Sequence, residues 1–283
     1  MASERSNSIQ SLERGLKVLR VLSSGSLFSL QDLHAATNIP KPSLLRILTT
    51  LGQAGLASRR LADGLYRASA FSSTGRKADR YDRVAEAAAP ILDDLCHRVL
   101  WPSDLMVPAG KYMERRETSQ AGSPFFPHRT TRNRVGQRVG WLLTGTGRAY
   151  LAFCPKRERE RILQRLRAST VPADLLARDP DGLEAVWAET RRRGFALRDN
   201  TFAGGSYGDF PIDDGLAAIA VPLLGRKQVY GAINLLWIKT AFTVDEFAAQ
   251  HLHLLQQAAS DIVSQLETMD AAGAVRTTHG RSR

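Results

Sequence analysis

The 283-residue sequence has only two cysteines, Cys96 and Cys154, and no apolar run near the roughly 20 residues that span a bilayer. Two cysteines are too few for a disulfide framework and favour a reducing compartment. The N-terminal MASERSNSIQ lacks the apolar stretch of a signal peptide. These absences predict a cytoplasmic protein without a membrane-spanning segment, and 43% hydrophobic with 24% charged residues is typical of a globular chain.

Residue patterns that support catalysis or metal binding are also scarce. The cysteines have no neighbouring ligands at zinc spacing, and His251 and His253 point to different faces of an expected helix. The segment GGSYG at 204–208 fits G-x-S-x-G but lacks the preceding buried strand and following helix of a nucleophile elbow. TGTGRA at 144–149 has only part of a dinucleotide-binding fingerprint. The sequence predicts no enzyme, no metal and no cofactor, and a hydrolase built around Ser206 is kept as an alternative.

What the sequence has in excess is positive charge, concentrated near its N-terminus. The formal net charge is +11. Residues 1–80 hold twelve basic and five acidic side chains, a net of +7, so the much longer remainder carries only +4. A basic excess attracts nucleic acid or an anionic membrane surface. Its concentration at one end favours DNA, the alternative being a solvated basic surface.

Residues 9–73 have the pattern of a winged helix-turn-helix. Helical periodicity occurs in IQSLERGLKVLRVLSS, in SLQDLHAAT with Ser29 as its cap, and in KPSLLRILTTLGQ; a hairpin turn at Asp63-Gly64 follows. The inward-facing side chains predicted for the three helices are Ile9, Leu12, Leu16 and Leu19, with Val18 and Leu22 beside them; Leu30, Leu33 and Ala36; and Leu44, Ile47, Leu48 and Leu51.

The third helix carries polar residues beside its first turn and one leucine off its apolar stripe. In a helix-turn-helix this turn and the outer face of the helix enter the major groove, and the helix N-terminus favours a phosphate. The off-stripe leucine can contact a thymine methyl or be simply exposed. Arginines flanking the hairpin can reach the DNA backbone or minor groove, or be ordinary surface arginines. The predicted DNA-binding residues are Lys41, Ser43, Leu45, Arg46, Arg59, Arg60 and Arg67.

Residues 74–100 predict a connecting helix. Trp101-Pro102 is expected to end it, and Pro90 is expected to kink or interrupt it. Its apolar face is also a candidate dimer seam. That face consists of Val84, Ala88, Ile91, Leu95 and Val99.

Residues 101–268 predict a mixed α/β domain. It contains a hairpin turning at Ala109-Gly110, a helix broken at Pro155, a helix capped near Gly194 and two apolar strands joined by a Gly-Arg-Lys turn. A long amphipathic helix with a Thr243–Glu246 capping box comes last. Residues 1–8 and 269–283 are expected to be mobile tails.

The chain resembles the IclR family of bacterial transcriptional regulators over residues 9–266. The resemblance rests on RGLKVLRVL, LQDLHAATNIPKPSLLRILTTLGQAGL, LYRAS, TGTGRAYLAFCP, RRRGFAL and GLAAIAVPLLGRKQVYGAINL, in this order. Within the family, VLWPSDL, RRETS and LAFCPKRERERIL are similar to activators of hydroxyphenylpropionate-type aromatic acid catabolism. The resemblance implies an α+β chain: a winged helix-turn-helix, a connecting helix and a GAF-like effector-binding domain. It also implies homodimers, often paired into tetramers, on a palindromic operator.

The resemblance further implies an effector pocket. Members that bind small polar acids have an acidic residue at the position of Arg198, a cysteine at that of Ala218, and serines at those of Asn234 and Leu236. The more apolar cup of this chain favours an aromatic ring, although the insertion GGSYGDFPIDD departs from the shorter loop of the family. The implied effector-binding residues are Leu142, Leu143, Thr144, Gly145, Arg198, Asp199, Ala218, Asn234 and Leu236.

An aromatic carboxylate needs a cationic or N–H partner when it is desolvated. Candidates are Arg132, Arg134, Arg148 and the amides of Gly145–Gly147, each arginine being equally interpretable as a surface charge. Side chains that could stack on the ring, or belong to the core, are Trp101, Trp141 and Phe126.

The sequence therefore predicts a sequence-specific regulator that a small aromatic acid controls, activating an aromatic-catabolism operon together with RNA polymerase. The effector would shift the placement of two DNA-binding domains through the connecting helix. The alternatives are a repressor of the same fold released by its effector, a non-specific nucleoid binder, and the hydrolase using Ser206.

Overall fold

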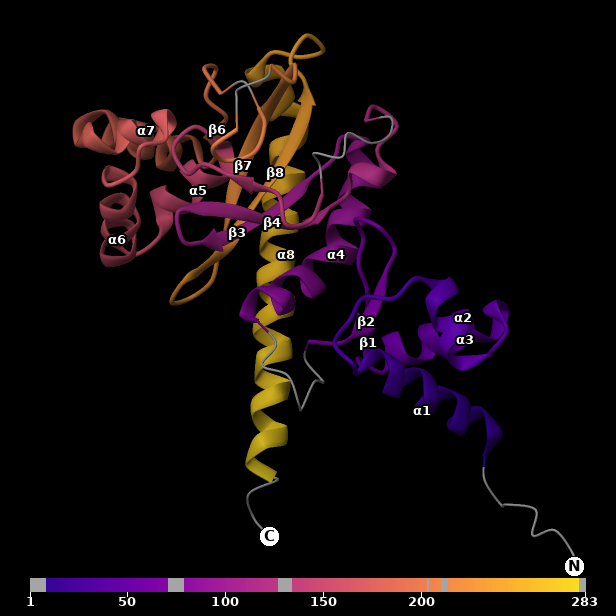
Figure 1. Ribbon diagram of the computed structural model, residues 1–283. Coiled ribbons are helices and arrows are strands. Elements are labelled where there is room, and N and C mark those ends of the chain that lie inside the picture. The colour runs from indigo at the N-terminus through magenta and orange to yellow at the C-terminus, as the bar shows by residue number, and fades with distance from the viewer. Residues whose placement is uncertain (1–8, 71–78, 127–133, 203, 210–212, 280–283) are drawn as a thin grey trace, which may run out of the picture. The chain divides into compact units, whose positions relative to one another are not determined.

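The computed structural model describes residues 9–70, 79–126, 134–202, 204–209 and 213–279, the last nine of them by backbone alone. The chain divides into two compact units, Met1–Glu86 and Ala87–Arg283, drawn in Figure 1. The predicted tail at 1–8, the predicted boundary between 73 and 74, and Arg132 lie outside the described residues.

The first unit consists of three helices followed by a small antiparallel hairpin. Ser58 lies opposite Arg67 in the hairpin, which turns at Asp63-Gly64 as predicted. Gly64 has a φ of 71°, a conformation that glycine adopts without strain. The predicted winged helix-turn-helix is confirmed. Its elements are α1 (Gln10–Leu22), α2 (Leu30–Thr37), α3 (Lys41–Gln53), β1 (Ala57–Arg59) and β2 (Tyr66–Ala68).

The core of this unit forms where the three helices meet. On α3, Leu44, Leu48 and Leu51 are buried and Ile47 is half-buried, as the periodicity predicted. A single cluster joins them to α1, α2 and β1 through Val18, Leu22, Leu33 and Ala57. Burial of this stripe fixes which side of α3 remains at the surface.

Two predicted packing faces are corrected. On α1 the buried residues are Val18 and Leu22, whereas Ile9, Leu12 and Leu16 are 66%, 56% and 49% exposed. Only the C-terminal half of α1 contributes to the buried cluster, so its N-terminal leucines have no core to enter. On α2 Ala36 is exposed and Thr37 is buried instead, its hydroxyl donating to the Leu33 carbonyl (2.6 Å).

Ser29 caps α2 as predicted. Its hydroxyl accepts from the Asp32 N–H (3.1 Å), and the Asp32 carboxylate accepts from the Ser29 N–H (2.8 Å). We expect Ser29→Ala to destabilise the first unit by about 1 kcal/mol, because a first-turn donor of α2 loses its acceptor. Hydrogen exchange of the α2 amides in the full chain measures this. Ser26→Ala, at an exposed position just before the helix, is the matched control and is expected to leave exchange unchanged.

Helix α4 (Arg80–Val99) continues through Pro90, so of the two predicted effects, a kink or an interruption, the interruption does not occur. A proline removes one backbone hydrogen bond of the helix and needs room for its ring. Pro90 is exposed, so its ring has room, and buried residues on both sides of it, among them Val84, Ala88 and Leu95, anchor the helix.

The second unit is built on a six-stranded antiparallel sheet in the order β5-β4-β3-β8-β7-β6. The strands are β3 (Asp104–Ala109), β4 (Tyr112–Thr118), β5 (Arg138–Val139), β6 (Ala196–Leu197), β7 (Leu216–Leu224) and β8 (Val229–Ile238). The helices are α5 (Gly145–Phe153), α6 (Lys156–Arg167), α7 (Pro180–Arg193) and α8 (Val244–His279), with two short 3-10 helices at Gln120–Gly122 and Pro172–Arg178.

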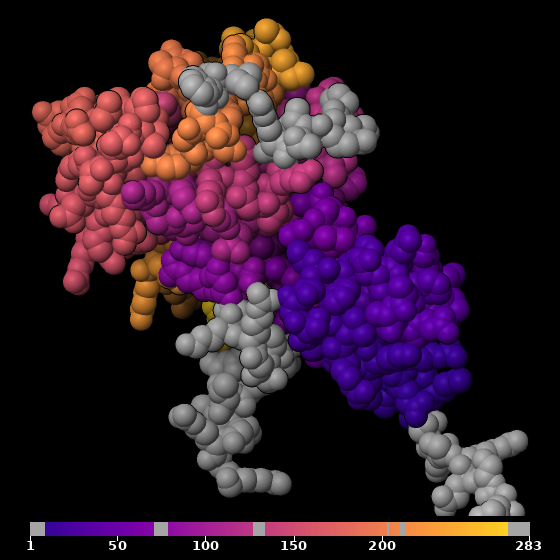
Figure 2. Space-filling view, viewed as in Figure 1, coloured from indigo at the N-terminus to yellow at the C-terminus, as the bar shows by residue number. Residues whose placement is uncertain are grey.

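Helices cover both faces of the sheet (Figure 1). Alternation along β8 separates the faces: Trp237 stacks on Phe247 of α8 at 3.9 Å between ring centroids, whereas Ala232 belongs to the cluster around Tyr150 of α5. In Figure 2 the segments around α6 and α7 form a lobe beside the sheet. The predicted α+β fold class is confirmed.

Most predicted boundaries of this unit agree with the structure. The first hairpin turns at Ala109-Gly110, Pro155 separates α5 from α6, and Gly194 ends α7 with a φ of 76°. Thr243 and Glu246 form the predicted capping box. The expected tail from residue 269 is helical as far as His279, in a segment without proline. Within the described residues, no helix combines the length and apolar character needed to cross a membrane.

Candidate DNA-binding surface and effector site

The outer face of α3 is polar and accessible. Lys41 and Arg46 are exposed, Leu45 is 46% exposed, and Ser43 at the first turn is half-buried. The opposite stripe through Leu44 is buried in the core of the unit. The helix therefore presents a cationic surface and its N-terminal amides without giving up core contacts, which is the arrangement that a groove-reading helix requires.

The three predicted wing arginines have different environments. Arg60 forms an ion pair with Asp63 inside the hairpin loop. Arg67 donates to the Asp82 carboxylate (3.2 Å) and to the Ser58 hydroxyl (3.3 Å). Arg59 is exposed and its Nε donates to the Gly64 carbonyl (3.3 Å). Arg60 and Arg67 thus stabilise the hairpin and are half-buried, whereas Arg59 is exposed.

Several implied effector residues lie together on the α5 side of the sheet. The Leu143 carbonyl accepts from the Asp199 N–H (2.9 Å), and the Arg198 N–H donates to the Ala218 carbonyl (3.1 Å). Ala218 pairs directly with Leu236, and its second neighbour Ala220 pairs with Asn234.

Helix α5 begins against these strands. A Cβ at Gly145 would lie 3.3 Å from the Ala220 Cβ and 3.3 Å from the Arg198 nitrogen, so a side chain here would push these neighbours back by a few tenths of an ångström. Thr144 caps the helix by accepting from the Gly147 N–H (3.2 Å), and the first-turn amides of Gly145 and Thr146 have no partner within the helix. A helix N-terminus with free amides favours an anion at this point.

The arginines predicted to bind the effector carboxylate mostly form hydrogen bonds within the protein. Arg148 donates to the Leu142 carbonyl (2.7 Å), to the Leu197 carbonyl (3.4 Å) and to the Asp199 carboxylate. Desolvation raises the pKa of Asp199, but hydrogen bonds from Thr201 and the Arg148 charge outweigh it and hold that pKa below its ordinary value. Arg148 therefore secures the turn before α5.

The remaining arginines are arranged differently. Arg198 donates to the Asp214 carboxylate (2.8 Å) and the Phe202 carbonyl (3.1 Å), and Arg134 is exposed. Of the arginines predicted to bind the effector carboxylate, those that the structure describes are therefore either exposed or hydrogen-bonded to other residues of the chain.

The three predicted ring-stacking side chains are not brought together. Trp101 lies near Phe126 (6.5 Å between centroids) and near Phe247 of α8 (6.2 Å). Trp141 packs on Tyr150 of α5 at 5.5 Å. The sheet separates the two groups, so Trp141 is the member that shares a face with the implied effector residues.

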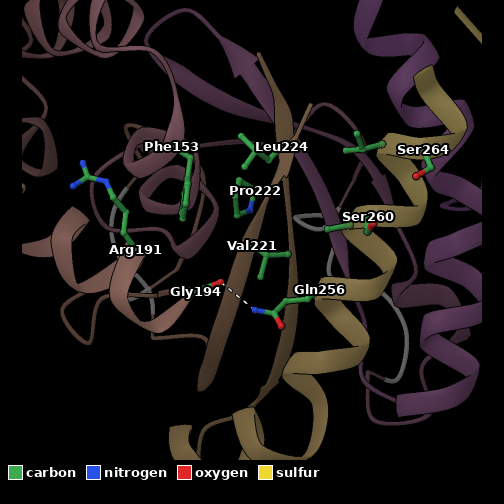
Figure 3. A pocket seen from close by; sticks show the side chains of 11 residues that line it. Phe153, Arg191, Gly194, Val221, Pro222, Leu224, Gln256, Ser260 and Ser264 are labelled. Carbon is green, nitrogen blue, oxygen red and sulfur yellow. Dashed lines mark hydrogen bonds between the residues drawn. The ribbon is translucent and has the colours of Figure 1, made fainter. Parts of the chain in front are cut away.

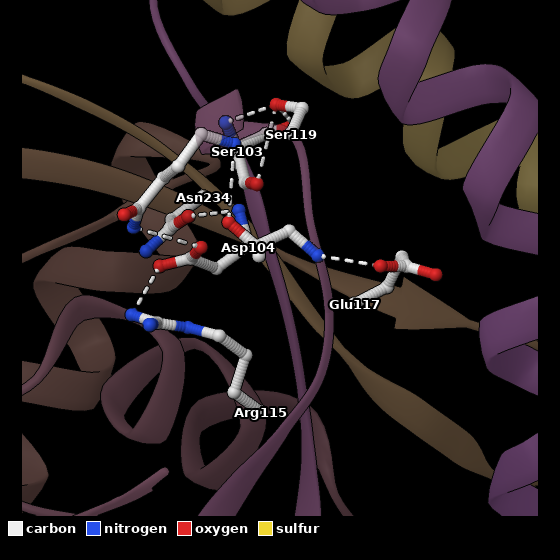
Figure 4. Close-up of polar contacts among 8 residues, drawn as sticks. Ser103, Asp104, Arg115, Glu117, Ser119 and Asn234 are labelled. Carbon is white, nitrogen blue, oxygen red and sulfur yellow. Dashed lines mark hydrogen bonds and ion pairs between the residues drawn. The ribbon is translucent and has the colours of Figure 1, made fainter. Parts of the chain in front are cut away.

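A buried polar cluster that the sequence reasoning missed lies on strands β3, β4 and β8 (Figure 4). The Arg115 Nη2 donates to the Asp104 carboxylate (2.7 Å), and the Asp104 N–H donates to the Asn234 side-chain oxygen (2.7 Å). Asp104 is 1% exposed and Arg115 is 6% exposed. Within the described residues, Nε and Nη1 of Arg115 are buried without a hydrogen-bond partner. Such unsatisfied donors cost about 1–3 kcal/mol each.

The sequence held a signal for this cluster. Alternate residues of a strand share a face, and in YMERRET the apolar Met113 places Arg115 on the buried side. Tracing the alternation through both hairpin strands would have placed Arg115 opposite Met106.

An open groove of about 420 Å³ lies elsewhere in this unit, between β7, α7 and α8 (Figure 3). Val221, Leu224 and Arg191 line it, and Gln256 donates across it to the Gly194 carbonyl (3.4 Å). None of the implied effector residues lines this groove.

The GGSYG segment does not form a nucleophile elbow. Residues 204–209 are turns and bends, without an adjoining strand or helix in the described part of the chain. Tyr207 anchors them by donating to the Asp174 carboxylate and by packing on Tyr112 at 5.7 Å. Burial raises the pKa of the Cys154 thiol to about 12, which disfavours the reactive thiolate. No cluster of potential metal ligands occurs among the residues that the structure describes.

Comparisons with known proteins identify both units. Residues 82–264 match the family model of the C-terminal domain of the bacterial transcriptional regulator IclR. Residues 11–61 match the family model of the IclR helix-turn-helix domain. The chain is 22% identical over 244 residues to the HTH-type transcriptional regulator KipR of Bacillus subtilis, covering 84% of this chain and 90% of KipR. The matched families and relatives are transcriptional regulators, not enzymes.

Two solved structures show the same fold. The IclR of Thermotoga maritima superposes with a TM-score of 0.51 at 18% identity, covering 92% of this chain and 99% of the other. An IclR homologue from Microbacterium hydrocarbonoxydans, solved in complex with 4-hydroxybenzoate, superposes with a TM-score of 0.50 at 18% identity, covering 92% of this chain and 100% of the other.

Proposed function

The chain belongs to the IclR family of bacterial transcriptional regulators, and from this premise we propose that a small aromatic acid controls its binding to a specific operator. In this proposal residues 9–73 bind DNA, residues 74–100 connect, and residues 101–268 bind the effector. The observation that carries the DNA-binding part is the exposed cationic face of α3 opposite a fully packed stripe.

The proposed DNA contacts divide by role. Arg46 and Leu45, on the outer face, read base edges, while Lys41 and Ser43 at the first turn contact phosphates. Arg59 extends the contact to the neighbouring backbone, and Arg60 and Arg67 support the hairpin that carries it. A homodimer, alone or paired into a tetramer, places two such helices on a palindromic operator.

The proposed effector is an aromatic carboxylate. Leu142, Ala218 and Leu236 are buried apolar positions on the α5 side of the sheet, and Asn234 is the polar residue among these strand positions. The complex of a distant homologue with 4-hydroxybenzoate supports the same ligand class for this chain. Binding would favour one arrangement of the DNA-binding units and so change operator occupancy.

We propose activation, through contact with RNA polymerase in the cytoplasm, as the sign of regulation. A repressor that its effector releases from DNA uses the same two sites. Mapping the operator against the promoter distinguishes the two, because an upstream site favours activation and an overlapping site favours repression.

Thermal unfolding with a ligand panel tests the effector. We expect 4-hydroxybenzoate and hydroxyphenylpropionates to raise the melting temperature of the full chain, since a ligand at a hundred times its Kd stabilises by about 2.7 kcal/mol. Glyoxylate and pyruvate are the controls and are expected to leave the melting temperature unchanged. A shift with the small polar acids and none with the aromatic acids would contradict the proposed ligand class.

A further inference from the structure

Strand β4 directs one arginine into the buried face of the sheet and the next arginine away from it. Arg115 is 6% exposed and lies directly opposite Met106, which belongs to the cluster around α5. Arg116 has the opposite orientation, is partly exposed, and pairs with Glu114 at 3.1 Å. Adjacent arginines of one strand therefore have different environments.

The guanidinium of Arg115 is only partly used by the protein. Nη2 binds Asp104, whose other oxygen accepts from the Gln120 amide (3.4 Å). Nε and Nη1 are buried and unpartnered among the described residues. A guanidinium has five N–H donors in a rigid plane, so one bond to Asp104 leaves most of its hydrogen-bonding capacity for an acceptor that the chain does not supply.

A series of contacts connects Arg115 to the implied effector residues. The Asp104 N–H donates to Asn234, Asn234 pairs across the sheet with Ala220, and Ala220 lies against Gly145 at the start of α5. Figure 4 shows Arg115, Asp104 and Asn234 side by side. A carboxylate among these residues has a buried guanidinium on one side and the N-terminal turn of a helix on the other.

We propose that Arg115 binds the carboxylate of the effector through the donors that Asp104 leaves unused. Asp104 is the positioning residue, because its bond to Nη2 fixes the plane of the guanidinium. The inference rests on the proposed aromatic-acid effector and names the residue that recognises its charge. Arg148 differs from Arg115 in that it donates to three protein acceptors. Arg198 donates to two acceptors through Nη2 and has one buried donor, Nε, without a partner among the described residues, whereas Arg115 has two such donors.

Titration calorimetry on the full chain tests this with two pairs of probes: 4-hydroxybenzoate against 4-hydroxybenzamide, and hydroxyphenylpropionate against its amide. We expect the wild type to prefer each acid by about 10- to 100-fold, the scale of charge-assisted hydrogen bonds in a desolvated site. Arg115→Lys keeps the ion pair with Asp104 but loses Nε and Nη1, so the preference should fall at least about tenfold.

A second variant guards against misfolding. Asp104→Asn with Arg115→Gln replaces the ion pair by a neutral pair and leaves no lone buried charge; it should bind acid and amide alike. Arg116→Lys, the same substitution on the other face of β4, is the matched control and should keep the wild-type preference.

The outcomes separate the two proposals. If either Arg115 variant, shown folded by its melting curve, keeps the acid preference, or if the wild type binds acids and amides equally, the role of Arg115 is refuted and the aromatic effector stands. If the wild type binds none of the four probes, the aromatic-acid proposal and this inference fail together.

Discussion

Arg46→Ala is expected to weaken binding to the specific operator by about 1–3 kcal/mol, roughly 5- to 150-fold, if Arg46 reads a base. Arg46 is exposed on α3, whereas the core of its unit depends on the opposite stripe. Truncating it is expected to remove a contact to DNA without opening a cavity. The loss should therefore be in affinity, with the stability of the unit unchanged.

Duplexes selected from a random library by the wild-type chain provide the operator for this measurement. Affinity for the selected and for random DNA is compared at one fixed salt concentration, because phosphate contacts alone show no sequence preference. Arg157→Ala removes the same charge from an exposed position on α6 and is expected to leave the specific affinity unchanged. Equal titrations for Arg46→Ala and wild type would remove Arg46 from the base-reading set, and equal affinity of the wild type for both DNAs would favour a nucleoid binder.

Local patterns predicted the helix-turn-helix well because each of its elements has a signal within a few residues. The Ser29 cap, the buried stripe of α3 and the Asp63-Gly64 turn depend on neighbours in the sequence. The partner of Arg67 is Asp82, on a later element, and no local pattern indicates such a contact. The wing arginines therefore looked equivalent in the sequence although their environments differ.

The apolar stripe of α1 shows a second limit. Helical periodicity identifies a face but not the length over which another element covers it. Ile9, Leu12 and Leu16 continue the pattern beyond the point where α1 reaches the core. Periodicity alone does not distinguish an apolar helix face that packs inside its own unit from one that does not.

The proposed effector site shows which contacts depend on pairing between residues far apart in the sequence. Resemblance to the IclR family placed the Leu142–Gly145 turn and the strand positions near one another, and the structure brings several of them together. Alternation along β4 indicates that Arg115 is buried but does not identify its partner, because Asp104 lies beyond a bulge between Leu105 and Met106 in the register of β3 and β4. The proposed role of Arg115 in effector binding depends on which side of the sheet α5 covers, and this is set by tertiary packing.

Gly147→Ala is expected to destabilise the second unit by about 3 kcal/mol, because the position has no room for a side chain. A Cβ there would lie 2.7 Å from the Cα and carbonyl carbon of Trp141, and closer still to its oxygen. Backbone atoms cannot rotate away, so α5 would have to separate from the turn that Thr144 and Arg148 hold. The first unit contains none of these contacts, so only the second unit should unfold earlier.

Thermal unfolding followed by hydrogen exchange in each unit measures this effect. Gly140→Ala is the matched control, since a Cβ there meets only the Tyr207 ring at 3.7 Å, an ordinary contact. Its expected effect is below about 1 kcal/mol, the scale of a glycine-to-alanine replacement that the backbone accommodates without strain. If Gly147→Ala melts with the wild type, the Trp141–Gly147 approach does not exist in solution. The start of α5 would then be free to move, and the anion site proposed at its first turn would lose the rigid support on which the effector proposal depends.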